Sequence, residues 1–296
     1  MTSAVEVEAP AVVTTPCLID NMTAEDYHGD PVPGGSLSSS GARKLLRPSC
    51  PALYRWEQDN PQPPRKTFEF GHASHKTVLG DGPDLEVIDQ PNYLTKAAKQ
   101  ARDEARAAGL IPLLRHEYEQ VQAMADEIRR HPVAGPLFTP GTGIAEQSGF
   151  WQDPATGVWC RFRPDWRRHR GDNDRLILVD YKTTTDVSPA ALQKTVYDYG
   201  YHAQGAWYRD GATALGLAGD IEPAFLFAFQ MKTPPYLVHL VELDMPALTF
   251  GAARNRRARE IYAECQATGN WPGFNDAITY LSLPPWGEKR DEEDYL

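Results

Sequence analysis

The apolar run Leu-Ile-Leu-Val at 176–179 ends directly in an acid, and a lysine follows two residues later. Four consecutive apolar residues predict a central strand that is buried on both faces. Alternate residues of a strand share a face, so Asp180 and Lys182 continue the row of Leu176 and Leu178. A carboxylate carried into a core needs a partner or a metal, because an unpaired buried charge is costly. The chain is therefore constrained to a sheet whose central strand delivers Asp180 and Lys182 at its end.

The composition allows a sizeable core and excludes several classes of protein. The chain has 296 residues, of which 41% are hydrophobic, and this length favours one elaborated domain. No run of about 18 apolar residues is present, so no segment is expected to span a membrane. The N-terminus has no basic stretch before an apolar one, which argues against a signal peptide and for a cytoplasmic protein. The four cysteines form no CxxC pair, so neither a zinc site nor an iron–sulfur cluster is expected.

The net charge of −10 bears on the partners of the chain. A general nucleic-acid binder is expected to be basic, so this charge argues against one. A local basic surface is still compatible with it, and clustered acids would attract a divalent metal. The candidate basic segments are RRHR at 167–170 and ARNRRAR at 253–259, and the alternative for both is a solvated charged face.

Hydrophobic periodicity predicts helices, then strands, then helices and strands again. We expect a single domain over 27–286, with a helical part at 27–140 and a sheet core at 141–286, between a flexible leader at 1–26 and a solvated acidic tail at 287–296. This order implies an α/β (α+β) fold with a mixed central sheet flanked by helices. The expected strands cover 143–151, 157–165, 174–183, 222–232 and 235–244, one long helix covers 245–268, and two helices within 95–131 are separated by a GLIP linker.

Asp165 ends the segment Arg-Pro-Asp on the strand that precedes the apolar run. Two carboxylates on adjacent strands can hold one or two Mg²⁺ ions, since this ion prefers oxygen ligands. Such an ion polarises a phosphate and lowers the pKa of a bound water, and a neighbouring lysine can orient that water. The Asp-Tyr-Lys triplet alone is also compatible with an exposed salt bridge at a strand end. The preceding Pro-Asp makes the pattern considerably more specific.

The pattern resembles the PD-(D/E)xK nuclease superfamily, and within it the exonuclease VIII-type branch of phage recombination exonucleases. Further segments that resemble this branch extend over residues 27–286 and include YHGDPVPGGSLSSSGARKLLRPSCPALYRW, FEFGHASH, FLFAFQMKTPPY and NWPGFNDAITYLSLPPW. Two features depart from the branch: the long insert WRRHRGDND between the two acid strands, and Met231 after Gln230, where an acid is expected after the glutamine.

The resemblance implies roles for individual residues. Asp165 and Asp180 match metal ligands, and Lys182 matches the catalytic lysine. The GxxxH match implies a further metal ligand at His75, for which the alternative is a core or surface histidine. Glu146 matches an acidic residue of the branch and is the fourth candidate ligand.

Other residues are expected to position the DNA. The QxxxY match assigns Gln204 and Tyr208 to the catalytic site, and the alternative for this pair is ordinary helix packing. The candidate DNA contacts are Arg161, Arg163, Ser39 and Lys44. Salt bridges to acids are the alternative for the arginines, and a plain helix cap is the alternative for the serine-rich segment.

The function that the resemblance implies is a Mg²⁺-dependent exodeoxyribonuclease, with Mn²⁺ as an alternative ion. It would degrade linear double-stranded DNA from 5′ to 3′ and leave a 3′ overhang for a single-strand annealing protein. A ring-shaped homo-oligomer with a basic channel would reconcile this function with the acidic net charge. Three alternatives stay open: an endonuclease, a CRISPR-associated-type end-trimming nuclease without an iron–sulfur cluster, and a catalytically silent DNA-binding or inhibitor protein on the same fold.

Overall fold

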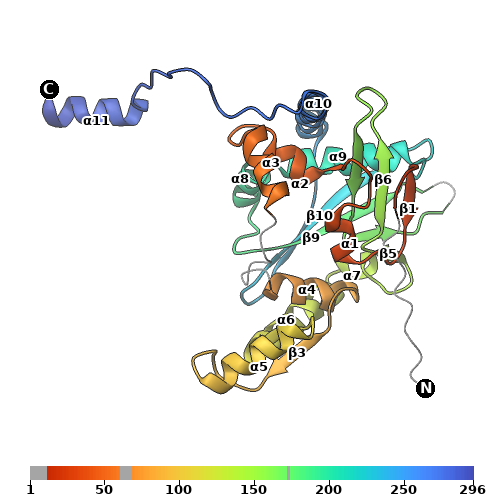
Figure 1. The fold of residues 1–296 in the computed structure, drawn as a ribbon. Coiled ribbons are helices and arrows are strands. Elements are labelled where there is room, and N and C mark those ends of the chain that lie inside the picture. Colours follow the sequence, from red (N-terminus) through yellow and green to blue (C-terminus); the bar gives the residue numbers. More distant parts are fainter. Residues whose placement is uncertain (1–11, 61–68, 172–173) are drawn as a thin grey trace, which may run out of the picture.

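The computed structural model describes residues 12–60, 69–171 and 174–296, and the strands within them form three sheets (Figure 1). The five-stranded sheet has the order β11-β10-β9-β8-β5, and its strands are β5 Gly143–Ala145, β8 Trp166–Arg168, β9 Ile177–Thr184, β10 Ala224–Met231 and β11 Val238–Glu242. The four-stranded sheet has the order β1-β6-β7-β2, and its strands are β1 Cys17–Ile19, β2 Leu37–Ser38, β6 Ser148–Gln152 and β7 Trp159–Phe162. The two-stranded sheet pairs β3 Leu85–Ile88 with β4 Ile111–Leu114.

Strand β9 lies at the centre of the five-stranded sheet, as the apolar run predicts. It pairs parallel with β10 and antiparallel with β8, which makes the sheet mixed. Leu176 and Leu178 pack into the core on one face of this sheet. Val179 and Tyr181 pack into a second core on the opposite face. The expected α/β fold with a mixed central sheet is therefore confirmed, and the strand that carries Asp180 is covered on both sides.

Helices cover the two faces of the five-stranded sheet. The first core is closed by side chains of α9 Tyr201–Ala214 and α10 Met245–Thr268, and the second by α4 Glu69–Leu79, α6 Arg115–Arg130 and α7 Ala134–Leu137. The remaining helices are α1 Ala24–Gly29, α2 Ser39–Lys44, α3 Pro51–Asp59, α5 Lys96–Ala107, α8 Pro189–Asp198 and α11 Pro285–Tyr295. Helices α9 and α10 approach each other so closely that a Cβ atom at Gly251 would lie 2.1 Å from the carbonyl oxygen of His202.

One local prediction from the sequence was wrong, and two other segments contain a strand that the sequence did not specify. The expected strand at 143–151 is two strands, β5 and β6, which belong to different sheets and are interrupted at Glu146, where φ is 50°. The two helices expected within 95–131 are confirmed as α5 and α6, and the GLIP segment between them contributes to strand β4. The long insert after Asp165 begins with strand β8. In each case pairing with a distant segment decides the structure, and local periodicity does not report such pairing.

The C-terminal segment extends away from the domain (Figure 1). Helix α11 has no buried residue. No helix in the described part of the chain combines the length and the apolar character that a membrane span needs.

Candidate metal and catalytic centre

Asp165 lies in the short segment between β7 and β8, just beyond the strand on which it was expected. It is buried, and its Oδ2 atom accepts a hydrogen bond of 2.6 Å from the backbone N–H of Tyr181. Its carbonyl oxygen accepts a second bond of 3.2 Å from the backbone N–H of Glu146. Asp165 is thereby tied to the central strand and to the break between β5 and β6.

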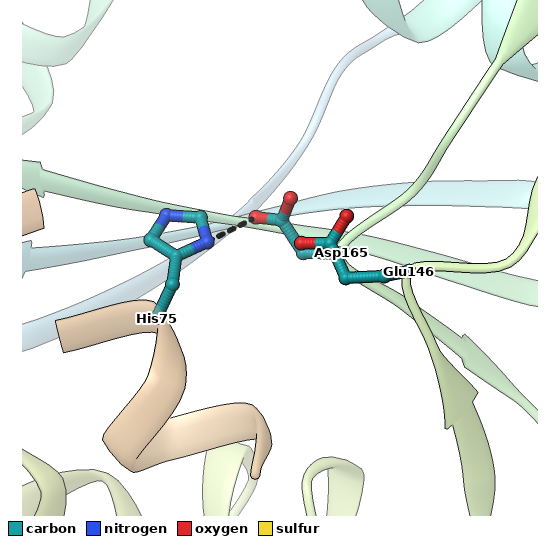
Figure 2. A group of neighbouring side chains, drawn as sticks. All are labelled: His75, Glu146 and Asp165. Carbon is teal, nitrogen blue, oxygen red and sulfur yellow. Dashed lines mark ion pairs between the residues drawn. The ribbon is translucent and has the colours of Figure 1, made fainter. Parts of the chain in front are cut away.

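His75 and Glu146 join Asp165 from two other elements (Figure 2). His75 extends from α4, and its Nδ1 atom lies 3.5 Å from Asp165 Oδ2. Glu146 occupies the break between β5 and β6, where its left-handed backbone turns the chain from one sheet to the other. One ligand atom from each of the three residues lies within 4.8 Å of the others. The structure thus brings together three of the four candidate metal ligands.

The electrostatics of these three residues favour a bound cation. Burial, and next the charge of Asp180, raise the pKa of Asp165 well above its usual value. Burial, and next the charge of Asp165, raise the pKa of Glu146 to about 7. Burial also lowers the pKa of His75, which keeps its imidazole neutral and able to bind a metal. Two crowded carboxylates and a neutral imidazole are a donor set that a divalent cation would stabilise.

Asp180 lies next to this group but is engaged differently. It is 2% exposed, and its Oδ1 atom accepts a hydrogen bond of 2.7 Å from Nε2 of Gln204. Its Oδ2 atom forms an ion pair of 2.5 Å with Nζ of Lys182, yet it accepts no hydrogen bond of good geometry within the described part of the chain. Burial lowers the pKa of Lys182, but Asp180 and Asp165 outweigh this effect and raise it, so the side chain is held as a cation.

Gln204 and Tyr208 are buried, and each bonds to a residue in or next to the candidate centre. Gln204 holds Asp180, as described above, and the hydroxyl of Tyr208 donates a bond of 3.0 Å to the carbonyl of Arg163. Both residues lie on one face of α9, as their spacing predicts. Their observed role is to fix Asp180 and the segment that leads to Asp165.

Two residues to which the sequence assigned no role support the centre. Tyr181, the middle residue of the Asp-Tyr-Lys triplet, places its ring 5.2 Å from that of His75. Its hydroxyl donates a bond of 2.6 Å to Oε1 of Gln230, which is completely buried. Gln230 in turn donates to the carbonyls of Met124 and Tyr236. The sequence signal is Gln230 itself, the glutamine that the resemblance also expects, because a polar residue in an otherwise apolar strand must find partners in the core.

The two arginines beside Asp165 are engaged within the protein. Nε of Arg163 lies 2.6 Å from Oε2 of Glu146, and its guanidinium also donates to the carbonyls of Met22 and Thr23. Arg161 forms an ion pair with Asp30 and donates to Ser36 at 2.7 Å. The structure therefore matches the salt-bridge alternative for both arginines, and Arg163 orients a candidate ligand.

The serine-rich segment begins helix α2. Oγ of Ser38 accepts a bond of 3.1 Å from the backbone N–H of Gly41, which is the expected cap. Lys44 forms an ion pair with Glu57. Ser39 is buried, and its hydroxyl has no hydrogen-bond partner among the described residues.

Comparisons with known proteins agree with this geometry. Residues 38–284 match the model of a family described as "PDDEXK-like domain of unknown function (DUF3799)". A solved structure described as "Putative exonuclease" from Eubacterium rectale aligns with 93% of this chain and 98% of that chain, at 11% identity and a TM-score of 0.57, and so shows the same fold. A second solved structure, described as SSO0001, aligns with 69% of this chain and 85% of that chain at 14% identity. Its TM-score of 0.30 is too low to indicate a shared fold. No curated protein matches the chain.

Proposed function

Because the chain belongs to the PDDEXK-like domain family that its residues 38–284 match, we propose that it is a divalent-metal-dependent nuclease that hydrolyses phosphodiester bonds of DNA. The observation that carries this proposal is the convergence of His75, Glu146 and Asp165 within 4.8 Å, beside the Asp180–Lys182 ion pair. Structural ion pairs alone would not require three metal-type donors at the same place.

The chain's own residues divide the work of such a reaction. His75, Glu146 and Asp165 would hold the metal, and Asp180 could add its Oδ2 atom to the set. When bound, a divalent ion would polarise the phosphate and supply an acidified water. Lys182, which stays charged, would balance negative charge that develops on the phosphate. Gln204 would keep Asp180 in place, and Arg163 would do the same for Glu146.

The finer proposal is a 5′–3′ exonuclease on linear duplex DNA that supplies 3′ overhangs for recombination. It is supported by the resemblance of residues 27–286 to the exonuclease VIII-type branch, and by the fold that the chain shares with a structure described as an exonuclease. The proposed ion is Mg²⁺, with Mn²⁺ as an alternative, and the proposed partners are an annealing protein and further copies of this chain.

The test is a cleavage assay on linear and covalently closed duplex DNA with Mg²⁺, with EDTA and Lys182→Ala as controls. We expect loss of the linear DNA alone, blocked by both controls. Cutting of the closed circle would replace the exonuclease with an endonuclease. If neither substrate is cut but DNA is bound, the protein is a silent binding protein and the proposed activity is wrong.

A further inference from the structure

An aromatic row leads from the core to the surface beside Lys182. Phe227 of β10 stacks on Tyr201 with ring centroids 5.2 Å apart, and Tyr201 stacks on Tyr199 at 5.7 Å with an angle of 19° between the rings. Nζ of Lys182 lies 5.3 Å from the centre of the Tyr201 ring. Phe227 is completely buried and Tyr199 is 60% exposed, so the row begins in the core and ends at the surface with the ring of Tyr199.

The turn between α8 and α9 fixes this row. Gly200 separates Tyr199 from Tyr201 and has a φ of 65°, a left-handed conformation that suits glycine. Arg43 of α2 packs against this turn, because a Cβ atom at Gly200 would lie only 2.8 Å from Arg43 Cδ. The guanidinium of Arg43 is thus held beside the two tyrosines.

The guanidinium of Arg43 has no negatively charged partner among the described residues. It forms no ion pair or hydrogen bond in the part of the chain that the structure describes, and its buried Nε atom has no partner there. Burial, the largest effect, lowers the pKa of Arg43, and the charged or ionisable groups that also act on it are Tyr201, Tyr208, Arg254 and Asp180. A partly desolvated cation without a partner is costly, so an incoming anion would stabilise it.

A second cation lies nearby on α10. Arg254 donates to Nε2 of His202 at 3.3 Å and forms no ion pair with a carboxylate among the described residues. Arg43 packs against the turn that carries the exposed Tyr199, and Arg254 contacts His202 in the helix that follows this turn. These two arginines without carboxylate partners among the described residues contrast with the net charge of −10 of the whole chain. A flat aromatic face with flanking cations is the combination that binds single-stranded nucleic acid, because bases stack on the ring and phosphates pair with the cations.

We propose that Tyr199, Arg43 and Arg254 form a ledge that binds the single-stranded nucleotides next to the bond that is cut. One base stacks on Tyr199, and a backbone phosphate binds Arg43, with Arg254 adding positive charge. The ledge rests on the proposed nuclease function and extends it, since it names an unpaired strand as the ligand beside Lys182. A DNA strand that separates from the duplex before it is cut would be able to bind the ledge and to reach the buried centre.

The ledge is tested by fluorescence anisotropy with a labelled oligothymidylate of about ten nucleotides, with Ca²⁺ in place of Mg²⁺ and the oligonucleotide checked for integrity. We expect Tyr199→Ala to weaken binding about tenfold, as for the loss of one stacked base, and Tyr199→Phe to bind like the parent. The matched control is Tyr280→Ala, which removes a 95% exposed tyrosine from the C-terminal segment and should change nothing.

The salt dependence of oligonucleotide binding distinguishes the contribution of Arg43 from that of Tyr199. Arg43→Gln should lower the slope of log affinity against log salt by about 0.7, as for one lost phosphate contact, whereas Tyr199→Ala should leave the slope unchanged. The control is Arg256→Gln, an exposed α10 arginine that faces Glu260. The ledge is refuted if Tyr199→Ala binds within about twofold of the parent, or if it weakens blunt duplex binding equally. Mg²⁺-dependent cleavage by the same parent preparation is scored separately, so failure of the ledge and failure of the nuclease proposal give different results.

Discussion

Lys182→Met should strongly destabilise the metal-free protein, because it removes the cation that faces Asp180. Asp180 is 2% exposed and would keep only the hydrogen bond from Gln204. Breaking a buried ion pair from one side costs about 3–5 kcal/mol. The Lys182 side chain is 26% exposed, so water can reach part of the site, and we expect a loss of about 3 kcal/mol.

Neutralising the acid of this pair, and not the lysine, should destabilise the protein less. Asp180→Asn keeps a group that can accept from Gln204, and Lys182 retains partial contact with water and the charge of Asp165. We expect a loss of about 1 kcal/mol, the typical net contribution of one hydrogen bond. The double variant no longer contains the unpaired carboxylate of Asp180. It should therefore be about 2 kcal/mol more stable than Lys182→Met alone.

The assay is urea unfolding in EDTA, with the free energy obtained by linear extrapolation. Saturating Mg²⁺ should restore more stability to Lys182→Met than to Asp180→Asn, since an ion can replace the lysine only where the carboxylate remains. The reasoning is refuted if Lys182→Met unfolds like the parent in EDTA, or if adding Asp180→Asn recovers none of the loss.

Three further predictions concern the orientation of Glu146, the hydrogen bonds of Gln230 and the C-terminal helix α11. Arg163→Gln should lower Mn²⁺ affinity about 10- to 100-fold in calorimetric titration, because Arg163 orients Glu146; unchanged affinity would leave the arginine a purely structural role. Gln230→Leu should cost about 3 kcal/mol in urea unfolding and Tyr181→Phe about 1–2 kcal/mol, because the first leaves three buried groups unpaired and the second leaves one; equal losses would contradict this. Deleting 287–296 should change the unfolding free energy by less than about 0.5 kcal/mol, since helix α11 buries nothing, and a larger shift would reveal an unseen contact.

The sequence predicts the central strand and its two polar residues well. An apolar run of this kind is buried on both faces when it forms a strand. Because alternate side chains of a strand share a face, the spacing alone places Asp180 and Lys182 on the same face. Helix α10 and the β10–β11 pair are predicted for the same reason, since their periodicity is local. The resemblance adds His75 and Glu146, which no periodicity identifies as neighbours of Asp165.

The partners of the candidate residues are not predicted from the sequence. Whether Arg163 binds Glu146 or a DNA phosphate depends on the break at 146, which sends β5 and β6 into separate sheets. The hydrogen bond from Tyr181 to Gln230 joins residues 49 positions apart. The sequence does not distinguish Arg43 from the arginines that have carboxylate partners. Its position becomes clear only when α2 packs against Gly200 in the folded chain.

The binding of Mn²⁺, followed by loss of the free-ion signal in electron paramagnetic resonance, tests the central claim most directly. The parent should bind the ion, and Asp165→Asn should weaken binding by more than the roughly 10- to 100-fold typical of an outer-shell partner. Asp59→Asn, which changes an exposed carboxylate on α3, should bind like the parent. If Asp165→Asn also binds like the parent, then the group of His75, Glu146 and Asp165 is not the metal centre of this protein.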